Sequence, residues 1–241
     1  MKILKAALSL MFCACAAAPA HAQMTWTDRG FVNASIGVQG GSRDLATSTT
    51  FTIYDEDATL ETTQNVGGGA FFDVGGGYKV WRNLAIGLGF TRVSSDSDVA
   101  VTARVPDPLI HDLVRTVSGT SPSAKHSEVA VNLSGTWMVP VTDKIDVGLS
   151  FGPTIFLVSQ DVPTAVTVTE PGPSLSAATM ATADKTTIGI HFGVDVAYLI
   201  TPRVGAGVLA RYSVGSADLE GASDSLTVGG FQIGGGVRIR F

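Results

Sequence analysis

The chain has 241 residues, of which 45% are hydrophobic and only 15% are charged, and its formal net charge is −5. The low charged fraction excludes a disordered tail protein, and the negative charge argues against a nucleic-acid partner because phosphates require a basic surface. After the first twenty or so residues, no uncharged run reaches the roughly 18 residues that a membrane-spanning helix needs. The composition therefore suggests a membrane protein that does not cross with helices.

The N-terminus has the pattern of a secretory signal peptide. Lys2 and Lys5 precede an apolar stretch over residues 6–18, and Ala20-His21-Ala22 supplies small residues on both sides of His21 before the expected cut. We predict a signal peptide over residues 1–22 and one domain over residues 23–241. Both cysteines of the chain lie in the signal peptide, so the mature domain is expected to have no disulfide and no thiol chemistry.

The mature chain alternates apolar and polar residues with a period of two. Leu84, Ile86, Leu88 and Phe90, for example, alternate with small or polar residues. A strand places successive side chains on opposite faces, so each such segment has one apolar and one polar face. We predict eight strands, over residues 30–40, 66–80, 84–93, 127–138, 145–158, 186–199, 204–214 and 225–241.

The connections between these strands are alternately long and short. The short ones cover residues 81–83, 139–144 and 200–203, and the long ones cover residues 41–65, 94–126, 159–185 and 215–224. This layout predicts an all-β fold: an eight-stranded, antiparallel, up-and-down transmembrane β-barrel with short periplasmic turns and long extracellular loops. The first two long loops contain period-two pieces of their own, which predict hairpins rising above the membrane.

Aromatic residues gather at the end of the strands that carries the short turns. Amphipathic rings favour the headgroup region of a bilayer, so they predict an interfacial girdle on the periplasmic side. Its expected members are Tyr78, Trp81, Trp137, Tyr198 and Phe241.

The last strand places Val237, Ile239 and Phe241 on its apolar face and ends on the aromatic residue. In this respect the chain resembles the bacterial outer-membrane β-barrel proteins, the porin-like and small OmpA-like barrels. The resemblance implies a bacterial outer-membrane location and a C-terminal signal that the outer-membrane insertion machinery reads. It also implies contact with outer-membrane lipids and lipopolysaccharide, and no cofactor. The chain departs from full-length OmpA-like proteins in stopping at Phe241, so we expect no peptidoglycan-binding domain. It does not predict an oligomeric state.

The polar faces of the strands point into the expected barrel and carry charge. The inward set consists of Asp73, Lys79, Glu128, Asp146, His191, Asp195, Arg211, Arg238 and Arg240. An eight-stranded barrel is only wide enough to be filled by side chains, and buried charges must be paired. These residues therefore predict a salt-bridged plug. The alternative is a polar pore lining, or a proton-sensitive gate around His191.

No residue pattern predicts an enzyme or a metal site. In His126-Ser127-Glu128, neighbouring residues of a regular strand point to opposite faces, so His126 and Ser127 should not meet. His111 and His191 are isolated in the sequence. The acidic loops are an alternative cation-binding surface, although Asp55-Glu56-Asp57 and Asp96-Ser97-Asp98 lack the spacing of a calcium loop.

The sequence thus favours a non-enzymatic outer-membrane barrel with a structural or surface-interaction role in the cell envelope. A porin-like channel for passive diffusion of small solutes is the alternative. The two differ in whether side chains fill the lumen.

Overall fold

The computed structural model describes residues 25–219 and 225–241, so the predicted signal peptide lies outside the described residues. Within the described part, no helix is long and apolar enough to cross a membrane. Residues 25–219 and 225–241 form ten antiparallel strands. They are β1 (Gly30–Gly40), β2 (Ser42–Ile53), β3 (Glu56–Gly67), β4 (Ala70–Trp81), β5 (Leu84–Pro106), β6 (Val114–Thr142), β7 (Ile145–Thr169), β8 (Ser174–Leu199), β9 (Val204–Ala217) and β10 (Leu226–Arg240).

Eight of these strands close into a ring. The pairing runs β5-β4-β1-β10-β9-β8-β7-β6, and β6 pairs back to β5. The ends of the chain meet in this ring, because β1 and β10 pair from Phe31 with Arg240 to Gly40 with Phe231. The predicted eight-stranded antiparallel barrel is therefore confirmed.

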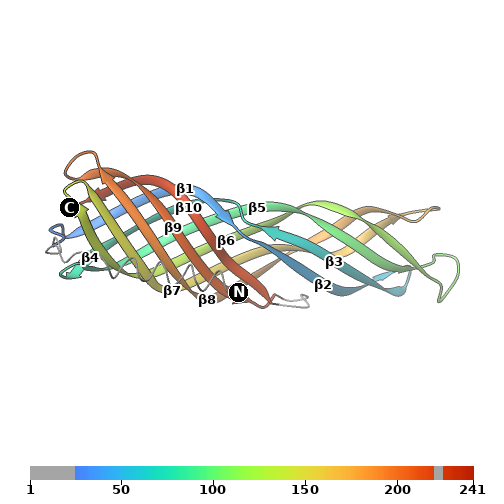
Figure 1. The fold of residues 1–241 in the computed structure, drawn as a ribbon. Helices are drawn as coiled ribbons and strands as arrows, with labels where there is room; N and C mark the ends of the chain where they lie inside the picture. Colours follow the sequence, from blue (N-terminus) through green and yellow to red (C-terminus); the bar gives the residue numbers. More distant parts are fainter. Residues whose placement is uncertain (1–24, 220–224) are drawn as a thin grey trace, which may run out of the picture.

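The remaining two strands belong to an extension beyond the ring (Figure 1). β2 continues β1, β3 continues toward β4, and their hairpin pairs with the far half of β5. β6, β7 and β8 also run on past the ring, whereas β9 and β10 end earlier. We call this part, built from β2, β3 and the far halves of β5 to β8, the extension.

The expected long loops are thus largely strand. The prediction that residues 94–126 and 159–185 are loops is wrong. β5 pairs with β6 as far as Pro106 with Val114, and β7 pairs with β8 as far as Thr169 with Ser174. True turns are confined to the ends of these hairpins. The hairpin pieces expected in the first two loops are confirmed, as β2–β3 and as the far half of β5–β6.

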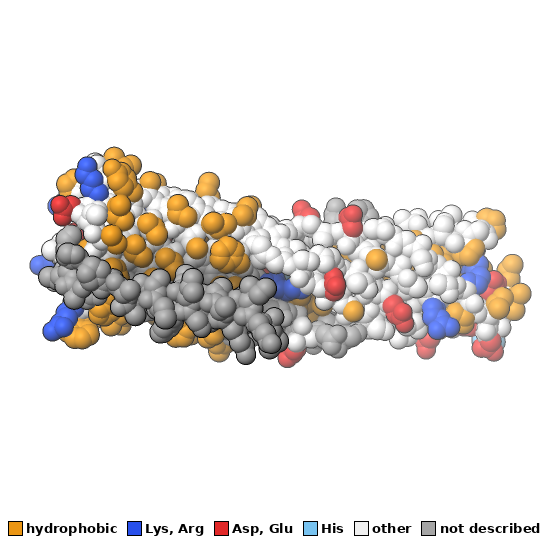
Figure 2. All heavy atoms as spheres, viewed as in Figure 1, with side chains coloured by type: hydrophobic (Ala, Val, Ile, Leu, Met, Phe, Trp, Pro, Cys, Tyr) orange, Lys and Arg blue, Asp and Glu red, His pale blue; other side chains and the backbone are white. Residues whose placement is uncertain are grey.

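The outer face of the ring is apolar and the outer face of the extension is polar. Figure 2 shows hydrophobic side chains gathered over the half of the molecule that contains the ring, with acidic and basic side chains scattered over the other half. On β5, Leu88 and Phe90 are exposed on the apolar side, and the next outward residues are Arg92, Ser94 and Asp96. Such a band of exposed apolar residues on a closed ring matches the hydrocarbon core of a bilayer.

The polarity of the buried side chains also changes between the ring and the extension. Inside the ring, buried residues such as Asp73, Glu128 and His191 are polar. Inside the extension, most of the buried residues are apolar, and nine of them form one cluster, which consists of Ala58, Leu60, Val99, Val101, Ala103, Val105, Val117, Ala124 and Val166. The ring therefore has the polarity pattern of a membrane protein, and the extension has that of a water-soluble β-structure.

Candidate functional site

The lumen of the ring is crossed by three layers of polar side chains. The layer nearest the extension centres on Glu128 of β6, whose carboxylate accepts a hydrogen bond from Gln39 Nε2 of β1 at 3.2 Å. His126 Nε2 lies 2.9 Å from Glu128 Oε1, and Arg43 Nη1 lies 3.7 Å from it. Gln39 in turn accepts a bond from Gln232 of β10 at 2.7 Å. This layer therefore links three strands of the ring with the start of β2.

A bend in β10 completes this layer. Gly229 and Gly230 have φ values of 87° and 140°, a region that side chains other than glycine rarely adopt. The Gly229 N–H donates to Glu128 Oε2 at 3.1 Å, and its carbonyl oxygen accepts from Gln39 and Arg43. A Cβ at Gly229 would lie 2.4 Å from the Ser213 carbonyl oxygen, so only glycine fits here.

The middle layer spans the full width of the lumen. Arg211 of β9 donates from Nη1 to Asp73 of β4 and to Thr91 of β5, both at 2.8 Å. Thr91 also donates to Asp73 at 2.6 Å. In the ring order, β9 and β5 are four places apart among eight, so they are opposite each other. One arginine side chain thus bridges the two walls.

His191 belongs to a chain of hydrogen bonds that starts at the same layer. Asn132 donates to Thr91, Thr154 donates to Asn132 Oδ1 at 2.8 Å, and His191 Nδ1 lies 2.8 Å from Thr154 Oγ1. Because the Thr154 proton is committed to Asn132, Nδ1 must carry the proton that the Thr154 oxygen accepts. His191 Nε2 lies 2.9 Å from the Ser134 hydroxyl oxygen. Both ring nitrogens of the histidine that is isolated in the sequence therefore have hydrogen-bond partners.

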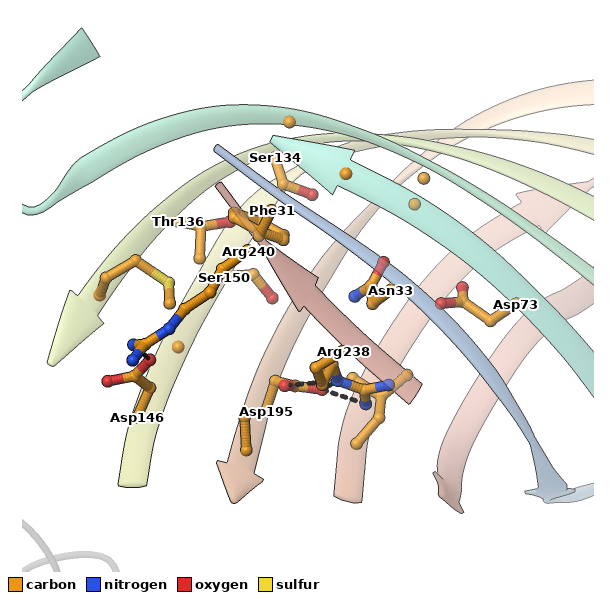
Figure 3. A pocket seen from close by; sticks show the side chains of 18 of the residues that line it. Phe31, Asn33, Asp73, Ser134, Thr136, Asp146, Ser150, Asp195, Arg238 and Arg240 are labelled. Carbon is orange, nitrogen blue, oxygen red and sulfur yellow. Dashed lines mark hydrogen bonds and ion pairs between the residues drawn. The ribbon is translucent and has the colours of Figure 1, made fainter. Parts of the chain in front are cut away.

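The third layer lies toward the end of the ring that carries the short turns. Arg238 makes a bidentate contact with Asp195 and also donates to Ser35. Arg240 bridges Asp146 and Asp28. These pairs join β10 to β8 and to β7 across the lumen. Figure 3 shows both arginines facing their carboxylates.

A cavity of about 90 Å³ separates this third layer from the middle one. Its wall includes Asn33, Asp73, Asp146 and Arg211, and each of these has a buried polar atom without a protein partner. Buried polar atoms of this kind are normally satisfied by water, and the cavity has room for several molecules. Trp26 also lines this cavity and is buried, and its carbonyl oxygen accepts from Lys79 Nζ at 2.7 Å. The sequence did not indicate this role for Trp26.

The nine residues expected to face inward therefore do not form one network. Eight of them lie in the three layers, and Lys79 instead closes the short-turn end through Trp26. Sequence reasoning missed Gln39, Gln160 and Asn132, which are buried in the lumen and complete its hydrogen bonds. These amides lie on the polar faces of predicted strands or at their ends, so the alternation already indicated them.

The aromatic side chains of the expected girdle lie at the short-turn end. Tyr78, Trp81, Tyr198 and Phe241 are exposed, and Trp137 is half-buried. Val237, Ile239 and Phe241 are likewise exposed on the outer face of β10. The Phe241 carbonyl oxygen accepts from the Arg29 and Gly30 N–H groups, so the last residue is held in the closed ring.

His126, Ser127 and Glu128 do not form a catalytic arrangement. His126 and Glu128 face the lumen and bond to each other, and His126 Nδ1 lies 2.8 Å from Gln160 Oε1. Ser127 lies on the opposite face of β6, between Ser94 and Ser159 of the neighbouring strands. Both ring nitrogens of His126 are thus occupied by partners other than a serine.

A second cluster lies at the tip of the extension. His111, from the β5–β6 turn, has Nδ1 2.8 Å from Glu56 Oε1 at the start of β3, and Nε2 3.7 Å from Asp112 Oδ1. The hydrogen bond that His111 donates to the Glu56 carboxylate, together with the charges of Asp112 and Glu56, raises the pKa of His111 above 6.5. The sequence could not indicate this contact, because the two partners are 55 positions apart.

An ion pair at the same end of the extension ties two turns together. Arg115 donates to the Glu170 carboxylate, with Nη1 at 3.0 Å, and its Nε lies 3.3 Å from Asp107. The hydrogen bond from Arg115 lowers the pKa of Glu170 below its ordinary value of 4.5. The ends of the β5–β6 and β7–β8 hairpins are therefore cross-linked.

Comparison with known proteins gives weak structural likenesses. No protein-family model and no curated sequence matches the chain. Among solved structures, Neisserial surface protein A is 14% identical with a TM-score of 0.45, and the match covers 88% of this chain and 97% of that one. OprG of Pseudomonas aeruginosa is 9% identical with a TM-score of 0.46, covering 91% and 98%. The outer-membrane protease OmpT of Escherichia coli is 10% identical with a TM-score of 0.42, covering 92% and 99%.

All three of these neighbours are bacterial outer-membrane proteins, and likeness at this level says nothing about activity. The class follows from this chain's own structure. A closed antiparallel ring with an apolar outer band and a polar lumen satisfies every backbone group within lipid. The protein is therefore a small transmembrane β-barrel with a structured extension beyond the membrane.

Proposed function

We propose that this protein is a non-enzymatic, non-conducting barrel of the outer membrane that has a structural and surface-interaction role in the cell envelope. The ring anchors the molecule in lipid, and the extension presents its hairpin ends outside the cell. The observation that carries the proposal is the Arg211 bridge to Asp73 and Thr91, which crosses the whole lumen in a single layer. The Glu128 layer lies beyond it, so an ion would have to break two layers.

The extension supports the surface role. Its apolar interior and the Arg115 cross-link between hairpin ends make it a rigid stalk rather than a set of free loops. At its end, Leu109 is 92% exposed, and Ile110, Leu113 and Val114 are exposed beside it. Large apolar side chains that stay exposed away from the membrane are typical of interaction surfaces.

The proposed partners of the ring are membrane components. The exposed apolar band supports contact with the acyl chains of outer-membrane lipids and with lipopolysaccharide. The outward row Val237, Ile239 and Phe241 supports recognition of the last strand by the insertion machinery. Since β10 is paired on both sides in the closed ring, such recognition would precede closure.

A porin-like channel is the second candidate. The observation that favours it is the cavity of about 90 Å³ in the short-turn half of the ring, whose wall contains buried polar atoms without protein partners. If the layers above it rearranged, this water-filled space would become the inner part of a pore.

Ion conductance distinguishes the two functions. The mature protein is reconstituted into planar bilayers, and its folding is verified by a shift in gel migration between unheated and boiled samples. We expect no steady conductance from folded, inserted protein. A defined single-channel conductance that persists at constant voltage would establish the channel and exclude the plug.

A further inference from the structure

The tip of the extension brings together three side chains with the donor atoms of a metal site. Glu56 is the first residue of β3, and His111 and Asp112 come from the turn between β5 and β6. One donor atom from each of the three lies within 4.8 Å of the other two. We propose that Glu56, His111 and Asp112 bind a divalent transition-metal ion of the Zn²⁺ class.

The donor set favours this class over calcium or magnesium. Calcium takes six to eight oxygen ligands and magnesium an octahedron of oxygens, whereas an imidazole with carboxylates suits Zn²⁺ and similar ions. Zn²⁺ sits about 2.0–2.2 Å from nitrogen and oxygen ligands, which in a tetrahedron places two ligands roughly 3.4 Å apart. His111 Nδ1 and Glu56 Oε1, now 2.8 Å apart, would separate by a few tenths of an ångström when the metal replaces the shared proton.

The ligands are held in place before any ion arrives. The Asp112 N–H points at Glu56 Oε2 at 3.4 Å, which fixes the two turns relative to each other. Within the β5–β6 turn, Asp107 Oδ1 accepts from the N–H groups of Leu109 and Ile110 at 2.9 and 3.2 Å. Binding therefore orders little additional backbone, and the entropy cost that weakens sites on free loops is reduced.

The surroundings favour a dication. The carboxylates of Glu56 and Asp112 balance the two positive charges of the ion. The side chains of His111 and Asp112 are 78% and 88% exposed, so an ion has free access and water can fill the remaining coordination positions. The site lies at the far end of the extension from the apolar band, away from lipid headgroups (Figures 1 and 2).

Such an ion would join two hairpins that are separate in the chain. The Arg115 cross-link already ties β5–β6 to β7–β8, and β3 already pairs with β5, so a metal at Glu56 would add one more link between the ends of β2–β3 and β5–β6. We therefore expect the ion to stabilise the packing of these hairpin ends. This inference does not depend on whether the lumen conducts.

The test uses the untagged mature chain, refolded in a synthetic detergent free of lipopolysaccharide. The other histidines in the described residues, His126 and His191, are buried and bonded, so His111 is the accessible one among them. Titration calorimetry with Zn²⁺ should give one site per chain, and Co²⁺ should give a visible d–d absorption. Ca²⁺ at the same concentration should displace neither ion.

Three ligand variants and one control complete the experiment. His111→Gln, Glu56→Gln and Asp112→Asn should each weaken Zn²⁺ binding by at least tenfold, since even partners that only orient a ligand are worth about 10–100-fold. Asp57→Asn removes the same charge from an exposed neighbour and should change the affinity by less than about twofold. Absence of Zn²⁺ binding to the unaltered chain, or equal losses in Asp57→Asn and Glu56→Gln, would overturn the proposal.

Discussion

Each buried charge in the lumen has an opposite charge within contact distance, and the choice of partner depends on the closed ring. Asp73 meets Arg211 from a strand 138 positions later, and Glu128 meets Arg43 from the start of the extension. The alternation in the sequence predicts that these residues point inward. It cannot predict which of them meet, because that depends on which strands lie opposite each other and at what stagger.

Removing one member of the Arg211–Asp73 pair should destabilise the barrel strongly. Arg211→Met leaves the buried Asp73 carboxylate with Thr91 as its remaining partner, and breaking a buried pair costs about 3–5 kcal/mol. Urea unfolding in detergent, followed by tryptophan fluorescence, measures this loss. Arg203→Met, in an exposed turn, is the matched control and should change the free energy of unfolding by less than about 0.5 kcal/mol.

The double variant Arg211→Met/Asp73→Asn decides the cause of that loss. It removes both charges, so we expect it to recover a large part of the stability. If the double variant is as unstable as Arg211→Met alone, lost packing rather than an unpaired charge explains the effect.

The Arg115–Glu170 pair predicts a local acid sensitivity at the tip. The pKa of Glu170 is lowered, so the contact stabilises the folded tip above about pH 4.5 and loses this contribution as the pH falls through the lowered pKa. Carboxyl ¹³C shifts report the titration of Glu170 directly. Arg115→Gln should move its midpoint up toward 4.5.

The control for this titration is Arg104→Gln, which removes another exposed arginine of the extension and should leave the Glu170 midpoint in place. If the Glu170 midpoint moves equally in both variants, the summed electrostatic potential of the surrounding charges, and not the Arg115 hydrogen bond, determines this pKa.

At the scale of strands, the period-two pattern predicts the ring well and the extension poorly. The eight ring strands were placed from their apolar outward faces, which lipid requires to be continuous. In the extension, the apolar face turns inward, and the outward face carries Ser, Thr and Asp, as over Ser94–Asp98 of β5. Polar residues of this kind are also typical of loops, so the sequence alone did not distinguish extended strands from connections.

The extension has its own core, so it should be possible to loosen it without opening the ring. Leu60→Ala removes a side chain that is 1% exposed in the apolar cluster, a change that typically costs about 2–5 kcal/mol. We expect faster proteolysis within β2 and β3 while the difference in gel migration between unheated and boiled protein remains. Thr59→Ala, on the other face of β3, should behave like the unaltered protein.

Loss of the gel-migration difference in Leu60→Ala would contradict this view. It would show that the ring and the extension unfold as a single cooperative unit.

At the scale of the whole molecule, the polarity inverts once along the barrel axis. Outside, exposed residues change from Phe90 to Arg92 along β5 and from Ile188 to Thr186 along β8. Inside, buried residues change from Glu128 and Gln160 to Val99 and Val101. A chain with this inversion is stable only if the first part is in lipid and the second part is in water, which defines its position in the membrane.

Site-directed labelling in intact cells tests this position most directly. Residues 23–241 contain no native cysteine, so single cysteines at Ile190 on the ring and at Thr102 on the extension are unique labels. A membrane-impermeant maleimide should modify the cysteine at position 102 rapidly and leave the one at position 190 unmodified until the protein is unfolded. Equal labelling of both positions, or labelling of 102 only after the outer membrane is broken, would contradict a lipid-embedded ring with an extracellular stalk.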